Sequence, residues 1–237
     1  MKELQRPRGV RAIVKTLRAV YPHKVEGAEK LQAYEQGDVL FICNHGEIYG
    51  PVAAMLYLPT VFRPWVLSRM MIRDEIVEHM YYGTMERQKW LPEKWKRPLL
   101  RLITPFLVYL FEGVHAIPVY RGQPRELMKT FRLTLDAMRD GHNILIFPEN
   151  ADEHEEGKSG FIKDGVGDFY TGFAMLGMMH WARNKRRAVF VPVYANKRKR
   201  LVTIDDGIVF DPENGTNEEK LRIAQMLHER LSAMARE

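Results

Sequence analysis

The first candidate for chemistry is the pair Asn44 and His45, which directly follows the apolar run 38–43 and precedes a predicted helix over 52–58. That run predicts a buried strand. In open α/β sheets, ligand-binding and catalytic side chains gather beyond the carboxyl ends of strands. An imidazole there can act as a general base because its ordinary pKa lies near neutral pH. A lone histidine at a strand end is more often structural, so further groups are needed.

Three more blocks coincide with predicted strands, and two of them end in polar groups. The block 113–121 reads Gly-Val-His-Ala-Ile-Pro-Val-Tyr-Arg and ends in the cation Arg121. The block 146–150 reads Ile-Phe-Pro-Glu-Asn, so a proline turn and the carboxylate of Glu149 close another strand. The last block, 190–194, is an apolar strand with a central proline. A base, a cation and a carboxylate are therefore expected near one edge of a sheet.

Together with Asn44 and His45, these blocks resemble the signature blocks of the glycerolipid acyltransferase superfamily, of the 1-acyl-glycerol-3-phosphate (lysophosphatidate) acyltransferase type. That family has an Asn-His-x4-Asp block, a Gly-x-Ile-x-Val-x-Arg-like block, a Phe-Pro-Glu-Gly-Thr-Arg-Ser block and a Val-Pro-Val block. The resemblance covers about residues 35–205. The four blocks occur in the family's order and at comparable spacing, which is more specific than any one block.

The resemblance implies lipid metabolism, such as phospholipid biosynthesis: transfer of a fatty acyl group from acyl-CoA or acyl carrier protein to a hydroxyl of a lysolipid-like acceptor. His45 would remove the hydroxyl proton, and backbone N–H groups at the start of the next helix would stabilise the oxyanion. No metal and no tightly bound cofactor is implied. The substrate-binding candidates carried over from the family's blocks are Asn44, Arg121, Pro148, Glu149 and Asn150.

The first block departs from the family at Gly50, which stands where the family has the aspartate that orients the histidine. The nearest carboxylate is Glu47, and residues two apart do not face each other in a helix. Glu47 therefore reaches His45 only if the turn is non-helical at Gly46, which glycine permits. Glu47 is the candidate orienting acid, or else a first-turn carboxylate that complements the helix dipole. The alternatives are no acid at all or a carboxylate from elsewhere, such as Glu149 or Asp152.

The third block departs as well, because Asp152 stands where the family has an arginine that contacts the acceptor phosphate. Further acids follow within the run 152–156, and such a cluster would repel a phosphate that bidentate arginine would hold. Arg121 remains to bind an anion, and Lys158 or Lys163 are substitutes from the same loop. The expected acceptor is therefore neutral, zwitterionic or amine-bearing rather than lysophosphatidate.

Two rival sites have weaker chemical support. The run 152–156 combines carboxylates with an imidazole, the ligands of divalent cations, but a contiguous charged run is more often a solvated loop. Cys43 could be a nucleophile beside His45, yet it lies in an apolar strand where a free cysteine is usually buried in the core.

Other functions also remain open. Gly50 and Asp152 fit a non-catalytic acyl or lipid binder on the same scaffold, and water as the acceptor would make the protein an acyl thioester hydrolase. The basic runs 185–187 and 197–200 raise nucleic-acid binding, but no recognisable DNA or RNA module surrounds them. Contact with an anionic membrane surface explains these runs together with the basic N-terminal helix and the aromatic segment, so nucleic acid is not an expected partner.

Alternating apolar runs predict an α/β fold: a central mostly parallel or mixed sheet flanked by helices, in a single domain over 1–237. The pattern also predicts a hairpin over 200–210. The predicted strands are 38–43, 62–68, 113–120, 143–147 and 188–194. The predicted helices are a basic amphipathic one over about 7–20, then 52–58, 72–82, 125–139, 169–184 and 217–236.

An aromatic insertion over about 84–111 interrupts the alternation. It carries Trp90 and Trp95 among basic residues, followed by the apolar run 99–111, which is too short to span a bilayer and contains an arginine and a proline. Tryptophan beside cations and an apolar stretch is typical of an interfacial helix or a lipid-facing lid. An aromatic-rich core helix is the alternative.

The composition agrees with a globular protein. The 237 residues carry 36 Lys and Arg against 30 Asp and Glu, a formal net charge of +6, and 46% are hydrophobic, which excludes a disordered or collagen-like chain. One cysteine forms no internal disulfide, no signal peptide is recognisable, and no stretch of uncharged apolar residues is long enough to span a membrane. The expected location is cytoplasmic, peripheral to the inner face of the membrane.

Overall fold

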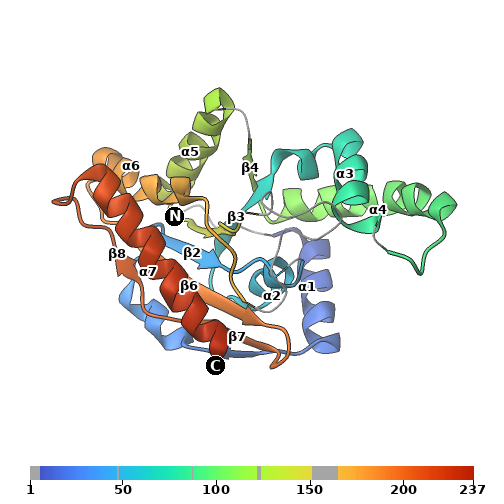
Figure 1. Cartoon of the computed structure of the whole chain (residues 1–237), viewed down its shortest axis with the longest axis horizontal. Helices are drawn as coiled ribbons and strands as arrows, with labels where there is room; N and C mark the ends of the chain where they lie inside the picture. Colours follow the sequence, from blue (N-terminus) through green and yellow to red (C-terminus); the bar gives the residue numbers. More distant parts are fainter. Residues whose placement is uncertain (1–5, 47, 87, 122–123, 151–164) are drawn as a thin grey trace.

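The structure, a computed structural model, describes residues 6–46, 48–86, 88–121, 124–150 and 165–237. An eight-stranded sheet forms its centre. Helices lie on both faces of this sheet, and α3 and α4 extend to one side (Figure 1). The predicted α/β architecture is therefore confirmed.

The strands run in the order β1-β7-β6-β2-β5-β3-β4, and β8 also pairs with β6. β7 and β8 are antiparallel to β6, and the other pairs are parallel. This agrees with the predicted mostly parallel, mixed sheet. The strands are β1 (Lys24–Glu26), β2 (Val39–Cys43), β3 (Phe62–Leu67), β4 (Ile117–Val119), β5 (Asn143–Ile146), β6 (Val189–Asn196), β7 (Leu201–Ile204) and β8 (Ile208–Val209).

Seven α-helices and four short helical turns surround this sheet in the part of the chain that the structure describes. The helices are α1 (Arg8–Val20), α2 (Tyr49–Tyr57), α3 (Arg73–Met80), α4 (Glu93–Gly113), α5 (Pro124–Arg139), α6 (Met175–Asn184) and α7 (Thr216–Arg236). The short turns are η1 (Ala28–Ala33), η2 (Ser68–Met71), η3 (Tyr81–Met85) and η4 (Thr171–Ala174).

The central strand β2 is buried along its whole length because helices cover both faces of the sheet. Leu40 and Ile42 face a core shared with α5, α6 and α7. Phe41 and Cys43 face the opposite core, which α2 covers. Successive side chains of a strand alternate between faces, so an uninterrupted apolar run is needed here. That run is the pattern that predicted the strand.

The predicted strand over 113–120 is wrong at its beginning. α4 continues to Gly113, and β4 begins only at Ile117. His115 adopts a left-handed conformation with φ 54°. The N–H groups of His115 and Ala116 bond to carbonyls of the last helical turn, 2.9 and 3.0 Å away. This is a Schellman cap, in which glycine usually takes the left-handed position, so a histidine there gave no helix-end signal.

The predicted hairpin over 200–210 is also wrong, because β7 and β8 pair with β6 and not with each other. The two strands lie along the same edge of β6, and the turn around Asp205 separates them. Asp205 donates its N–H to the carbonyl of Pro192 at 3.0 Å. Pro192 has no N–H to return, so the ladder is interrupted opposite it. β7 and β8 are therefore two pieces of one interrupted strand.

The insertion lies between β3 and β4, where α3 and α4 form an arm beside the sheet (Figure 1). Ile76, Val77 and Leu100 form a small buried cluster between the two helices. α4 therefore has one buried face and one exposed face. No helix in the described part of the chain is long and apolar enough to cross a membrane.

Candidate functional site

The candidate site lies at the carboxyl edge of the sheet. β2, β5, β3 and β4 are consecutive parallel neighbours, so their carboxyl ends meet at the same edge. His45 follows β2 by two residues, Arg121 follows β4 by two, and Glu149 follows β5 by three. The sheet thus gathers the three polar groups at the edge where the sequence placed them.

His45 and Glu149 are in direct contact. The backbone N–H of His45 donates to Oε1 of Glu149 at 2.8 Å. The His45 ring is half-buried, its Nδ1 is shielded from solvent, and Phe147 lies edge-on to it with 5.8 Å between ring centroids. Two sequence blocks about a hundred residues apart therefore join at one hydrogen bond.

The turn after His45 is left-handed at Gly46, with φ 47°. The amide of Gly50 donates to the carbonyl of His45 at 3.0 Å, and the amide of Tyr49 donates to the carbonyl of Gly46 at 3.2 Å. The turn is therefore non-helical at Gly46, which is the condition for Glu47 to approach the histidine. Glu47 itself lies outside the described residues.

The glycine at position 50 has a steric cause. A Cβ at Gly50 would lie 2.0 Å from the carbonyl oxygen of Asn44 and 2.8 Å from that of His45. No side chain fits there on this backbone. A carboxylate at position 50, where the family has aspartate, is excluded for the same reason.

The role expected of the N–H groups at the start of α2, to stabilise the oxyanion, stays a prediction. The amides of Tyr49 and Gly50 are already bonded to carbonyls of the turn, and Pro51 has no N–H. These groups could bind an oxyanion only by breaking the turn, because each N–H is a single donor.

Asn44 is almost fully buried and joins β2 to β6. Its Oδ1 accepts the N–H of Ala195 at 2.8 Å, and its Nδ2 donates to the Ala195 carbonyl at 3.3 Å. This pair of bonds fixes the end of β2 immediately before His45. A role in substrate binding stays a prediction.

Glu149 is 1% exposed. Burial raises the pKa of its carboxyl group to about 7, while hydrogen bonds from the backbone N–H groups of His45 and Gly167 act in the opposite direction. The carboxyl of Glu149 therefore keeps its proton to a higher pH than an exposed glutamate does. Its contact makes it a positioning residue for His45, and its predicted role in acceptor binding stays a prediction.

Pro148 and Asn150 lie on either side of Glu149 in a short extended segment. The carbonyl of Pro148 accepts the N–H of Tyr170 at 2.9 Å, and the N–H of Asn150 donates to the carbonyl of Asp168 at 2.7 Å. Arg121 lies over the ring of Tyr170, with its guanidinium carbon 4.7 Å from the centroid. Tyr170 therefore connects the cation after β4 to the block after β5.

The structure adds two residues to this edge that the sequence reasoning missed. Arg69 lies two residues beyond β3, and His79 lies on α3. The pKa of His79 is lowered by burial, and further by the charges of Arg69 and Arg121. The missed signal was spacing, because Arg69 follows its strand by the same two residues as His45 and Arg121.

The rival sites gain no support from geometry. Cys43 is buried, and burial raises the pKa of its thiol well above the usual value, which disfavours the nucleophilic thiolate. No group of three or more metal-ligating side chains occurs among the described residues. The acidic run 152–156, including Asp152, and the lysines at 158 and 163 lie outside them.

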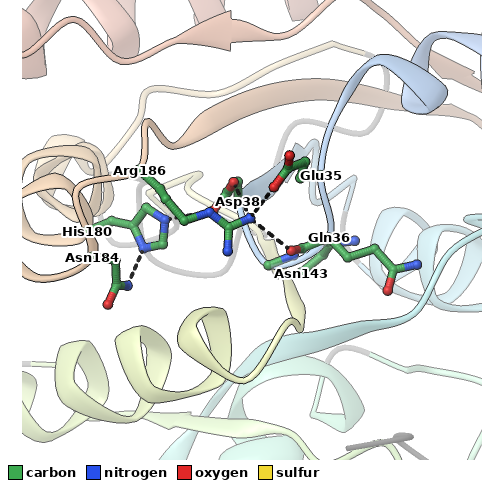
Figure 2. Close-up of polar contacts among 8 residues, drawn as sticks. Glu35, Gln36, Asp38, Asn143, His180, Asn184 and Arg186 are labelled. Atoms are coloured by element: carbon green, nitrogen blue, oxygen red, sulfur yellow. Dashed lines mark hydrogen bonds and ion pairs between the residues drawn. The ribbon is translucent and has the colours of Figure 1, made fainter. Parts of the chain in front are cut away.

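A second histidine–carboxylate pair lies at the opposite edge of the sheet (Figure 2). Nε2 of His180 is 2.9 Å from Oδ1 of Asp38, and Asn184 donates to Nδ1 at 3.0 Å. Arg186 contacts the other oxygen of Asp38 at 2.6 Å. Both ring nitrogens of His180 are engaged and the residue is fully buried, so no nitrogen is available to a substrate. This cluster joins α6 to the amino ends of β2 and β6.

No protein-family model matches this chain, and no curated protein matches its sequence.

Proposed function

We propose that this protein is an acyltransferase of the glycerolipid type, which moves a fatty acyl group from an acyl thioester to a hydroxyl of a lysolipid-like acceptor. The observation that carries the proposal is the hydrogen bond from the backbone of His45 to Glu149 at the carboxyl edge of the sheet. It joins the first and third of the four sequence blocks. Arg121 reaches the same segment through Tyr170.

In this reaction His45 takes the proton of the acceptor hydroxyl, and the oxygen attacks the thioester carbonyl carbon. The carbon–sulfur bond then breaks, and the leaving thiolate takes the proton back from the imidazolium. No covalent acyl-enzyme forms. Glu149 binds the backbone of His45 and not its ring, so it positions the histidine. Glu47 is the proposed partner of the imidazole.

The acceptor that fits best is zwitterionic. Arg69 and Arg121 make one part of the edge basic around His79, and they would hold an anionic group. The acidic run 152–156 follows the third block directly in sequence and would attract a cationic group. An acceptor with both charges satisfies both features, whereas lysophosphatidate satisfies only one.

The test is thiol release from acyl-CoA and acyl-carrier-protein donors, with and without mixed lysolipid acceptors. We expect acceptor-dependent release that falls about 10²–10⁴-fold in His45→Ala, the usual effect of losing a general base. His115→Asn is the matched control, because His115 is exposed and asparagine tolerates its left-handed backbone. The Glu47→Gln rate decides whether that carboxylate orients the histidine.

Three outcomes would contradict this reading. Release at the same rate without any acceptor would make the protein a hydrolase. No release from any donor by a folded protein that still binds acyl lipids would make it a binder. Equal rates in His45→Ala and wild type would remove the histidine from the reaction.

A further inference from the structure

α4 presents an apolar stripe to solvent. The stripe consists of Trp95, Leu102, Phe106 and Tyr109, all exposed, and Leu102 is 77% exposed. Their spacing of seven, four and three residues places them on one face of the helix. Large apolar side chains are commonly exposed singly, but four along one helix face form a contiguous surface.

The opposite face of α4 is already occupied. Leu100, Thr104 and Val108 are buried, and Leu100 belongs to the cluster shared with α3. The packing of the arm is therefore satisfied without the stripe. Trp90, which is 72% exposed in the segment before α4, adds a second exposed tryptophan. Packing of the described residues does not account for this surface.

Basic residues lie beside the stripe. Lys94 and Arg101 are exposed on α4, at its flank. α1 crosses the carboxyl end of α4: a Cβ on Gly9 would lie 2.7 Å from the Tyr109 hydroxyl, and a Cβ on Gly113 would lie 2.5 Å from a methyl of Val10. α1 thus continues the surface at the Tyr109 end.

The charge of α1 is entirely positive. Arg8, Arg11, Lys15 and Arg18 are exposed, and the helix contains no acidic residue. The exposed acids of the arm are partly neutralised, since Glu78 pairs with Arg97. Glu112 remains as an exposed acid near the end of α4, on the flank that carries Lys94 and Arg101. The surface as a whole is apolar at its centre and basic beside it.

We propose that this stripe together with α1 is a docking surface for an anionic lipid bilayer. Tryptophan, leucine and phenylalanine would enter the headgroup boundary, while the cations contact anionic headgroups. A second copy of the chain fits less well, because self-association through this face would bring the α1 cations together. The proposal goes beyond acyl transfer, because it concerns binding to a bilayer. Its test therefore needs no acyl donor.

The experiment is flotation of the full chain with phosphatidylcholine vesicles, with or without phosphatidylglycerol. We expect binding to the anionic vesicles that weakens as salt is raised, because headgroup attraction is screened. The double variant Leu102→Glu with Phe106→Glu should lower the bound fraction at least about tenfold, since it places charge in the apolar boundary. Leu221→Glu is the matched control, an exposed leucine on α7.

Circular dichroism of each variant tests whether the fold is retained. We expect that it is, because substitutions at exposed positions usually change stability little. Unchanged binding of the folded double variant would overturn the proposal. So would equal binding to neutral and anionic vesicles. Concentration-dependent dimers that Leu102→Glu abolishes, without vesicle binding by wild type, would assign the surface to a second copy. Vesicle binding by a chain that releases no thiol would support the docking surface and count against the acyltransferase.

Discussion

Glu149→Gln tests the environment of the candidate site through the pH dependence of stability. The folded protein holds the pKa of Glu149 at about 7, against an ordinary value of 4.5. Below pH 4.5 the carboxyl is protonated in both states, and its burial costs no ionisation energy. As pH rises, the unfolded chain releases this proton while the folded chain retains it. Stability is therefore lost as pH rises, until the folded group also ionises near pH 7.

The magnitude follows from these two pKa values. A shift of one pKa unit corresponds to about 1.4 kcal/mol, so the full loss is about 3 kcal/mol above pH 8. Most of it, about 2.5 kcal/mol, falls between pH 5 and pH 8. Glutamine keeps an acceptor oxygen for the His45 N–H but has no proton to lose. The free energy of unfolding of wild type, relative to that of Glu149→Gln, should therefore fall by about 2.5 kcal/mol between pH 5 and pH 8.

Urea denaturation of both proteins at pH 5, 6, 7 and 8 measures this difference. Glu219→Gln is the control: hydrogen bonds from Arg222 and other groups lower the pKa of Glu219 to about 2, so it is ionised in the folded state throughout this range and largely ionised in the unfolded state. Its difference from wild type should stay constant with pH. Parallel pH profiles for wild type and Glu149→Gln would refute a buried carboxyl with a raised pKa.

Two further predictions concern stability at each edge of the sheet. Gly50→Ala should destabilise the protein by about 1–3 kcal/mol or more, because its Cβ has to displace the Asn44 carbonyl, whereas Gly172→Ala, whose Cβ meets open space, should not. Equal unfolding midpoints in urea would contradict the close approach. Asp38→Ala should cost about 1–3 kcal/mol by leaving the buried His180 without its partner. Glu35→Ala removes only an exposed ion pair and should cost at most about 1 kcal/mol; equal costs would contradict the buried cluster.

The sequence predicted the buried strands well and their connections less well. β2 and β6 are continuous apolar runs, and that pattern follows directly from burial on both faces. β1 has only three residues at the edge of the sheet, which is too short for an alternation of apolar and polar residues to predict a strand. The relation of β7 to β8 depended on Pro192 of another strand, and no local pattern contains that information.

The candidate site was predictable in its residue types but not in their contacts. His45, Arg121 and Glu149 could be chosen because each follows a predicted strand. The stacking of Arg121 on Tyr170, and the proximity of Arg69 and His79, depend on how the inserted arm returns to β4. The burial of Glu149 could not be read either, because a glutamate after a strand is usually solvated.

Of the two departures from the acyltransferase pattern, the one at Gly50 has a steric explanation in the structure. Gly50 is required by the backbone: the carbonyls of Asn44 and His45 occupy the space of any side chain there. The same turn brings the His45 amide to a carboxylate from the third block. The fixed element of this site is therefore the backbone of His45, held by Glu149, which follows β5, and by the bonds of the neighbouring Asn44 to Ala195 of β6. If His45 abstracts a proton as proposed, its orienting group has to come from a position other than 50, and the left-handed backbone at Gly46 meets the condition that the proposed Glu47 requires.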